Sequence, residues 1–143
     1  MLTKYVLGFA FDLPEEIAYG DMNTQVGLIR KVRPEWQSGY LNGIGGHIEE
    51  GETAHQAMVR EFKEETGLFV PNWSGVTVMS NDYFNLAVFK AFNVPLNDME
   101  SLTDEAIGIY RAHDLQSDVI FNLRWLIPLS LDPQMYSSSV VCK

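Results

Sequence analysis

Three acidic residues, Glu61, Glu64 and Glu65, have the spacing that would place their side chains on one face of a helix. In an α-helix, residues three and four positions apart lie on the same side, within an arc of about 100°. Carboxylates held this close together repel one another unless a cation lies between them. Carboxylate oxygens also suit Mg²⁺, which proteins often bind together with phosphate groups. The spacing therefore predicts a magnesium site that handles phosphate and that would also accept Mn²⁺.

The segment around these acids has the composition and the end signals of a helix. Residues 54 to 65 contain neither Gly nor Pro and are rich in good helix formers. Thr53 is a good N-cap, and Gln56 can complete a capping box. Gly67 suits the position just past a helix end, where the backbone turns left-handed. We therefore predict a helix over about residues 53 to 66.

The neighbours of the acids are expected to divide between the site and the core. Ala54, Ala57 and Met58 lie along the same side of the predicted helix as the acids, so this side should face protein. Phe62 points away from the acids and is expected to enter the core. Arg60 flanks them, and we expect it to hydrogen-bond a carboxylate and to fix its orientation.

Taken alone, the hexapeptide REFKEE would be a solvated acidic surface in most proteins, but the surrounding positions favour a site. The stretch GHIEEGETAHQAMVREFKEETGL resembles the signature box of the Nudix hydrolases, G-x5-E-x7-R-E-U-x-E-E-x-G-U, in which U is bulky and apolar. Every fixed position is present, with Phe62 and Leu68 at the apolar places. The preceding RPEWQSGYLNGIGGHIEEGE resembles the approach to the box in the MutT-like branch, which acts on nucleoside triphosphates.

The resemblance implies a role for each polar residue of the box. The metal ligands would be the Gly46 carbonyl and the carboxylates of Glu61, Glu64 and Glu65. Arg60 would orient Glu61, and Glu52 would support the loop and reach the metal through water. The resemblance also implies an α/β/α sandwich around a central mixed β-sheet. The pattern of strands and helices by itself leaves α/β and α+β equally open.

The Nudix resemblance implies cleavage of a nucleoside diphosphate linked to another group. Metal ions would neutralise the pyrophosphate oxygens and lower the pKa of bound water, so that catalysis rests on positioning and electrostatics. The general base is open between Glu61 and an acid from a later loop. Asp104 and Glu105 stand just before a predicted strand, and we prefer Glu105. The alternative is that this Thr-Asp-Glu sequence is only a polar turn.

Candidates for substrate binding lie outside the box. Lys31 and Arg33 precede the glycine-rich stretch and would contact phosphates, unless they are merely solvated charges. Asn122 can donate and accept hydrogen bonds at a purine edge, as a late asparagine does in MutT-like enzymes, or it can cap the last helix. Trp36 and Tyr83 would stack on a base, although packing in the core or in loops is the favoured interpretation for both.

The leading hypothesis is a Mg²⁺-dependent hydrolase that converts a nucleoside triphosphate to a nucleoside monophosphate and pyrophosphate, with an oxidised nucleotide such as 8-oxo-dGTP as one candidate substrate. ADP-ribose, dinucleoside polyphosphates and capped RNA remain alternative substrates. A hypothesis of another class is a non-catalytic Nudix module that senses a nucleotide. Such modules typically lack box acids or have an added DNA-binding domain, whereas this chain keeps every acid.

Length, charge and cysteine content limit the domain organisation, the partners and the location that the sequence allows. The 143 residues favour a single domain, and the net charge of −9 disfavours binding of polymeric nucleic acid but not of a small phosphorylated substrate. The single cysteine, Cys142, leaves no intramolecular disulfide and favours a cytoplasmic location. No stretch predicts a signal peptide or a membrane span. The sequence leaves monomer and homodimer open.

The hydrophobic pattern along the chain predicts the strands and helices around the site. We expect strands over residues 4–11, 24–31, 41–48, 75–80, 83–93 and 106–111. A second helix is expected over residues 121–129, bent or stopped by Pro128. Loops are predicted over 12–23, 33–39 and 95–103. Residues 112–118 are expected to end in a short helical turn, and residues 132–143 are expected to form a tail.

Overall fold

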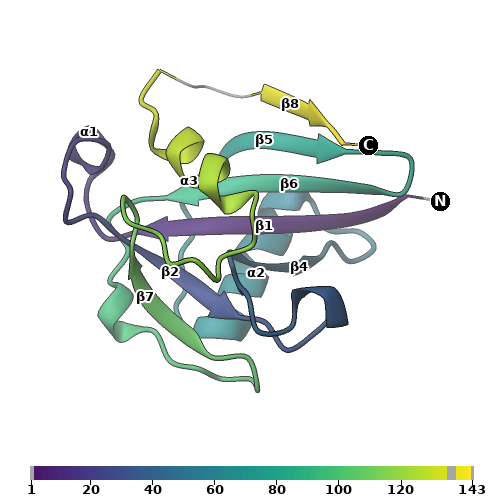
Figure 1. The fold of residues 1–143 in the computed structure, drawn as a ribbon. Coiled ribbons are helices and arrows are strands. Elements are labelled where there is room, and N and C mark those ends of the chain that lie inside the picture. The colour runs from purple at the N-terminus through teal and green to yellow at the C-terminus, as the bar shows by residue number, and fades with distance from the viewer. Residues whose placement is uncertain (1, 135–137, 143) are drawn as a thin grey trace.

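The computed structural model describes residues 2–134 and 138–142. The strands are β1 Thr3–Phe11, β2 Gln25–Arg30, β3 Leu41–Asn42, β4 Ile44–His47, β5 Ser74–Ser80, β6 Phe84–Ala91, β7 Ile107–Arg111 and β8 Ser138–Val141 (Figure 1). The helices are α1 Glu15–Ala18, α2 Ala54–Thr66 and α3 Leu123–Leu131, and single 3₁₀ turns occur at η1 Glu35–Gln37 and η2 Leu96–Asp98.

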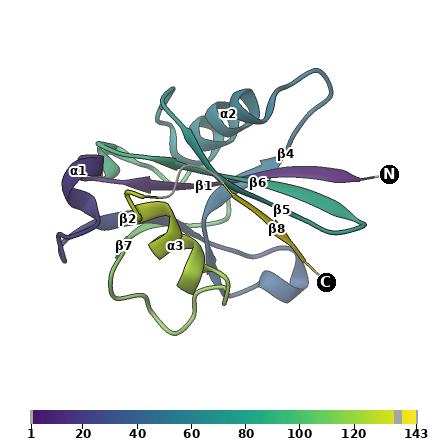
Figure 2. The ribbon, with the colours of Figure 1, turned by 90° about the horizontal axis from the view of Figure 1, so that it is seen from above.

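All eight strands join one mixed sheet with β1 near its centre. The order is β3-β2-β1-β6-β5-β8, while β4 also pairs with β1 and β7 also pairs with β2. Strand β1 runs parallel to β6, and β5 runs parallel to β8, whereas the other pairs are antiparallel. Helix α2 lies on one side of the sheet and α3 on the other (Figure 2). This arrangement confirms the expected α/β fold with a central mixed sheet.

The central strand β1 contributes side chains to a hydrophobic core on each face of the sheet. Leu7, Phe9 and Phe11 belong to the core on the α3 side, and Val6 and Ala10 belong to the core on the α2 side. Successive side chains of a strand point to opposite faces, so a strand covered on both faces must be apolar at nearly every position. The apolar run of β1 therefore follows from its place between two helices.

Helix α2 begins and ends as predicted. The Thr53 hydroxyl accepts a hydrogen bond from the Gln56 amide at 3.1 Å, and the Gln56 side chain accepts one from the Thr53 amide at 2.9 Å, which completes the capping box. Gly67 follows the helix in the left-handed conformation with a φ of 81°, and its amide donates to the Lys63 carbonyl. Local chemistry therefore determines both ends of the helix that contains the acids.

Replacing Phe62 by Ala is expected to lower the free energy of unfolding by about 3–5 kcal/mol. Phe62 is fully buried, and its ring packs edge-on against Trp73 with 5.1 Å between the ring centroids. Urea unfolding followed by circular dichroism measures the change. The matched control is Phe69→Ala, because Phe69 is 66% exposed and should cost much less. Equal losses in both variants would contradict the packing described.

Helix α3 covers most of the predicted helix over 121–129, and it continues past Pro128 to Leu131. A proline within a helix costs about 3 kcal/mol. Residues on both sides of Pro128, including Leu126, Ile127 and Leu131, are buried against the sheet, and each such side chain contributes about 1.5–3 kcal/mol. Pro128 therefore does not stop the helix, because this burial outweighs the local cost, and the other expectation, that Pro128 bends the helix, stays a prediction.

Three other segments differ from the sequence-based expectation. The predicted loop over 12–23 contains the short helix α1, and residues 112–118 form turns without the expected helical turn. The predicted tail over 132–143 includes β8, whose backbone pairs with β5, while residues 135–137 and 143 lie outside the described part. Among the described residues, no helix has the length and apolar character needed to cross a membrane.

Candidate functional site

The site lies where strand β4 packs against helix α2. A Cβ atom added to Gly46 would lie 2.5 Å from both Cδ and Oε1 of Glu61, closer than side-chain atoms can approach. Only a glycine at this position therefore leaves room for the Glu61 carboxylate to lie against the strand backbone. The side chain of Glu61 is 13% exposed. The structure thus brings together two of the predicted metal ligands, which are fifteen positions apart in the chain.

Arg60 connects the acids of the loop and the helix. Its Nε and one terminal nitrogen donate to the two oxygens of Glu52 at 2.7 and 2.9 Å, and the latter nitrogen also donates to the His47 carbonyl at 2.9 Å. Its other terminal nitrogen donates to Glu61 at 2.9 Å and to Glu64 at 3.2 Å. Such charge-assisted pairs fix geometry more firmly than neutral hydrogen bonds do. Arg60 makes the hydrogen bond to Glu61 that the sequence suggested.

Hydrogen bonding and burial shift the pKa values of the acids in opposite directions. Hydrogen bonds from the Arg60 side chain and from a backbone amide lower the pKa of Glu52 to about 2. Burial raises the pKa of Glu61 despite its contact with Arg60, and the charges of Glu64 and Glu65 raise it further. Burial also raises the pKa of Glu65. Glu61 and Glu65 are therefore carboxylates whose charge would be better stabilised by an added cation.

The donor set fits a hard divalent cation. Within residues 2–134 and 138–142, no three His, Cys, Asp or Glu side chains converge closely enough to hold an ion as they stand. Three carboxylates nevertheless lie within electrostatic range of one another, and the backbone of Gly46 contacts one of them. The Glu64 side chain is 57% exposed, so it can turn toward a ligand at little cost. Oxygen donors of this kind are those that Mg²⁺ and Mn²⁺ prefer.

Glu105 is a buried acid, not part of a plain polar turn. It is 5% exposed and accepts hydrogen bonds from the Lys31 ammonium at 3.1 Å and from the Val32 and Arg33 amides at 2.7 and 3.3 Å. Burial alone would raise the pKa of Glu105, but the Val32 amide and the Lys31 side chain together outweigh it and lower the pKa. The 103–105 segment is thus bound to the end of β2.

The two cations predicted to contact phosphates are both paired with acids of this segment. Lys31 binds Glu105, and Arg33 forms an exposed two-pronged ion pair with Asp104. The hydrogen bond from Arg33 lowers the pKa of Asp104. These pairs were not predictable from the sequence, since no spacing rule relates positions more than 70 apart.

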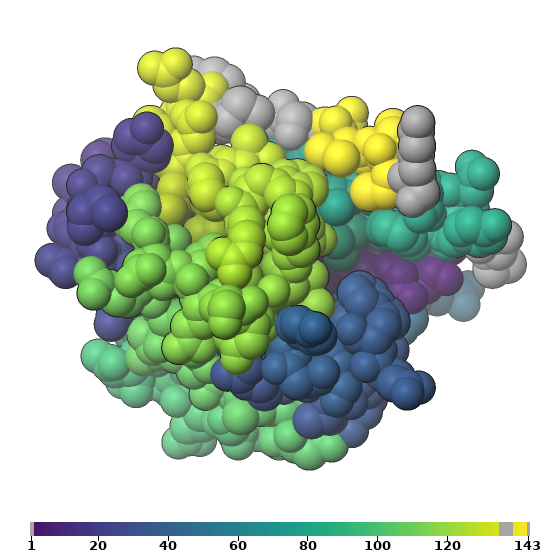
Figure 3. All heavy atoms as spheres, viewed as in Figure 1, coloured from purple at the N-terminus to yellow at the C-terminus, as the bar shows by residue number. Residues whose placement is uncertain are grey.

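The yellow-green segment before α3 lies beside the blue segment that precedes β3 (Figure 3), and the Leu41 amide donates to the Asp118 carbonyl at 2.9 Å. Asn122 is the N-cap residue of α3, but its side chain makes no capping hydrogen bond. Oδ1 of Asn122 and Oδ1 of Asp118 are buried without a hydrogen-bond partner in the described structure. The other oxygen of Asp118 accepts from Arg30. The local sequence around Asp118 gives no signal of this buried acceptor, because its burial depends on contacts with distant residues.

Two aromatic residues considered for base stacking are exposed. Trp36 is 69% exposed and Tyr83 is 78% exposed, so neither packs in the core, and both lie outside the strands and α-helices. Both side chains are available for contact with a ligand, because water can be displaced from an exposed ring at little cost.

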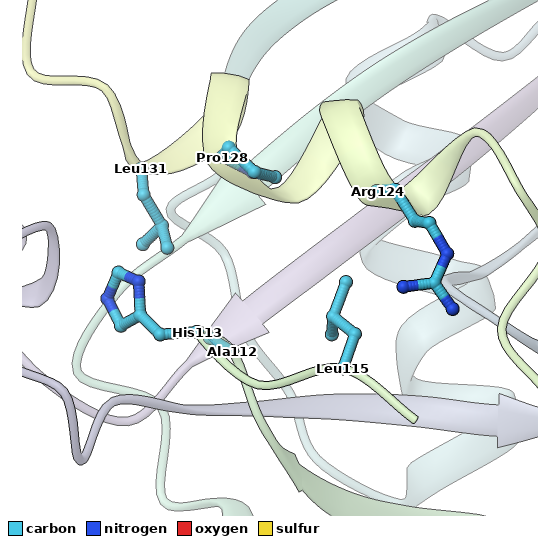
Figure 4. Close-up of a pocket in the computed structure, with 6 residues that line it drawn as sticks. All are labelled: Ala112, His113, Leu115, Arg124, Pro128 and Leu131. Atoms are coloured by element: carbon cyan, nitrogen blue, oxygen red, sulfur yellow. The ribbon is translucent and has the colours of Figure 1, made fainter. Parts of the chain in front are cut away.

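A separate hollow of about 250 Å³ lies between α3 and the loop after β7 (Figure 4). Its lining residues are Ala112, His113, Leu115, Arg124, Pro128 and Leu131. Figure 4 shows the His113 ring beside Leu131 and the Arg124 side chain at the other end. The ring nitrogen of His113 is already 3.1 Å from the Ala18 carbonyl. None of the predicted site residues lines this hollow, so the proposed chemistry is not placed there.

Comparison with known proteins assigns the family. The family model of the NUDIX domain matches residues 19–123, a range that contains every predicted site residue. The chain belongs to the Nudix family. The matched range runs from the end of α1 to the start of α3, so it includes the box, the 103–105 segment and Asn122. A comparison with curated protein sequences finds no match.

Solved Nudix structures share the fold at low sequence identity. A MutT/nudix family protein from Enterococcus faecalis has a TM-score of 0.70 at 16% identity. The match covers 90% of this chain and 61% of that protein. A MutT protein characterised in Aliivibrio salmonicida and Vibrio cholerae has a TM-score of 0.70 at 18% identity. The match covers 94% of this chain and all of that MutT chain.

A third structure is the NUDIX domain of Shewanella oneidensis NrtR, complexed with ADP ribose. It has a TM-score of 0.67 at 17% identity, over 91% of this chain and 86% of that domain. At such identities, similarity establishes the fold and leaves the substrate open.

Proposed function

We propose that this chain is a Mg²⁺-dependent pyrophosphohydrolase that converts a nucleoside triphosphate to a nucleoside monophosphate and pyrophosphate. The observation that supports it best is the contact between the Glu61 carboxylate and Gly46, within a complete Nudix box and beside Glu64 and Glu65. A net charge of −9 also suits a small substrate better than a polymeric nucleic acid.

Each residue of the box has a defined task in this proposal. The Gly46 carbonyl and the carboxylates of Glu61, Glu64 and Glu65 hold Mg²⁺, or Mn²⁺ in its place. When bound, the ions neutralise the pyrophosphate oxygens and lower the pKa of a water molecule. Arg60 orients Glu61 through the hydrogen bond at 2.9 Å, while Glu52 holds the guanidinium from its opposite edge.

Two carboxylates are candidates for accepting the proton of the attacking water. Glu105 has a lowered pKa and is charged at neutral pH, but its two oxygens already accept three hydrogen bonds. Glu61 is the candidate within the box, and a cation bound to its carboxylate would offset the rise in pKa that burial causes. We retain Glu105 as the candidate from outside the box. Its pairing with Lys31 also supports a second task, the positioning of that cation near the phosphates.

Unpaired acceptors support recognition of a purine base by Asn122. A buried oxygen without a hydrogen-bond donor costs free energy, which a ligand with N–H groups would recover. Oδ1 of Asn122 and Oδ1 of Asp118 are both of this kind. Guanine and its oxidised form in 8-oxo-dGTP present N–H donors on the ring edge. We propose such a base as the preferred one, with Lys31 and Arg33 near the phosphates.

The similarity to the ADP-ribose-bound NrtR domain favours a second candidate. The chain would then hydrolyse ADP-ribose or another nucleoside diphosphate derivative, or would sense such a nucleotide without cleaving it. The complete set of box acids supports an enzyme over a sensor.

A nucleotide panel distinguishes these functions. The purified protein is incubated with dGTP, 8-oxo-dGTP, dATP, ADP-ribose, a dinucleoside polyphosphate and capped RNA, each with Mg²⁺ and each with a chelator. We expect fastest turnover of a purine triphosphate, to the monophosphate and pyrophosphate, and none with chelator. Preferential release of AMP from ADP-ribose would support the second candidate. Absence of turnover of every substrate with Mg²⁺ and with Mn²⁺ would contradict an enzymatic function.

A further inference from the structure

The hydroxyl of Thr103 joins an acid of the box to the buried acid outside it. Oγ1 of Thr103 lies 3.1 Å from Oε2 of Glu65 and accepts a hydrogen bond from the Glu105 amide at 3.2 Å. A threonine hydroxyl has a single proton to donate. The competing acceptor, the Glu105 carbonyl, is at 3.5 Å and is neutral, so the proton goes to the nearer, charged Glu65 carboxylate.

The segment that presents Thr103 is held at both ends. The Glu100 amide donates to the Thr66 carbonyl at 2.9 Å, which fastens the segment to the last turn of α2. The Ile107 amide donates to the Ser101 hydroxyl at 2.9 Å. Beyond Thr103, the Glu105 carboxylate binds the Val32 amide. The Thr103 hydroxyl is therefore a fixed donor, and the Glu65 carboxylate is oriented by it.

The orientation of the Glu65 carboxylate bears on how readily it can bind a metal ion. Glu65 is half-buried, and within the described residues Thr103 is the side-chain hydrogen-bond donor that it contacts. Carboxylates that bind metals are commonly held by such hydrogen bonds, whose loss costs about 10–100-fold in metal affinity or activity. We propose that Thr103 is a positioning residue, which holds one oxygen of Glu65 so that the carboxylate is ready to bind the divalent ion. This inference rests on the proposed function.

Isothermal titration with Mn²⁺ alone tests this role without any substrate. The variants are Thr103→Val, which removes the hydroxyl and keeps the shape, and Thr103→Ser, which keeps the hydroxyl. We expect about 10-fold weaker Mn²⁺ binding for the valine variant and affinity close to that of the parent protein for the serine variant. Thr103 is exposed, so neither change opens a buried cavity, and the urea unfolding midpoint should stay nearly unchanged.

The matched control is Thr77→Val. Thr77 is a buried threonine of β5 whose hydroxyl has no partner among the described residues, so the same chemical change should leave Mn²⁺ affinity unaltered. Parental Mn²⁺ affinity in Thr103→Val, in a parent protein that binds Mn²⁺ and hydrolyses nucleotides, would overturn this role and leave the proposed function intact. Equal weakening in Thr103→Ser would overturn it too. A parent protein that neither binds Mn²⁺ nor hydrolyses any nucleotide would overturn both.

Discussion

Replacing Glu64 by Gln is expected to reduce kcat by about 10²–10⁴-fold at saturating Mg²⁺. The substitution removes one negative charge from the carboxylate cluster and leaves a neutral amide, which is a poor ligand for a hard divalent ion. The fold should be preserved, because the Glu64 side chain is 57% exposed and its described side-chain partner is Arg60 at 3.2 Å. Arg60 keeps its stronger contacts with Glu52 and Glu61.

The measurement is the rate of nucleotide hydrolysis for the preferred substrate of the panel, with circular dichroism as the check on folding. Glu50→Gln is the matched control. Glu50 is an exposed acid at a variable position of the box, so it should retain the parental rate. If Glu64→Gln turned over nucleotides as fast as the parent protein does, the assignment of the box as the catalytic centre would be wrong.

Replacing Gly46 by Ala is expected to lower kcat/KM by about 100-fold while the protein stays folded. The added methyl group would meet Cδ and both oxygens of Glu61 at 2.5–2.7 Å. These atoms are at the far end of a flexible side chain, so the clash is relieved by moving the carboxylate away from the strand. That displacement removes the Glu61 carboxylate from the place where it would bind the ion. Hydrolysis kinetics and Mn²⁺ titration both report the loss.

Two other glycines calibrate this result. An alanine at Gly20 would meet no atom within 4 Å, so Gly20→Ala should behave like the parent protein. An alanine at Gly45 would meet the backbone of Val6 on the neighbouring strand, so Gly45→Ala should destabilise the sheet itself. Gly46→Ala is therefore the selective test of the site. Full activity in that variant would show that Glu61 acts from another position or not at all.

The local sequence determined helix α2 and the spacing of its acids. Thr53, Gln56 and Gly67 act through hydrogen bonds and backbone conformations within a few residues of themselves, and α2 has the predicted ends. The order Glu61, Glu64, Glu65 follows from helical periodicity alone. The Nudix fold was also predictable, because the box is a dense pattern whose fixed positions all match.

Tertiary contacts decided the features that depend on residues distant in the chain. The continuation of α3 through Pro128 follows from burial against the sheet, and the strand β8 exists because β5 offers an edge for pairing. The pairs Lys31–Glu105 and Arg33–Asp104 join segments more than 70 positions apart. Local propensity cannot encode such contacts, since they arise only when the whole core has formed.

The same division applies to the site. The sequence by itself determined which residues can bind a cation, since carboxylate type and helical spacing are local properties. Only the tertiary structure decided how deeply each acid is buried, that Gly46 lies against Glu61, and that Thr103 donates to Glu65. Burial and orientation depend on how strands and loops pack around α2, and these two quantities set the ionisation and the readiness of each acid for binding.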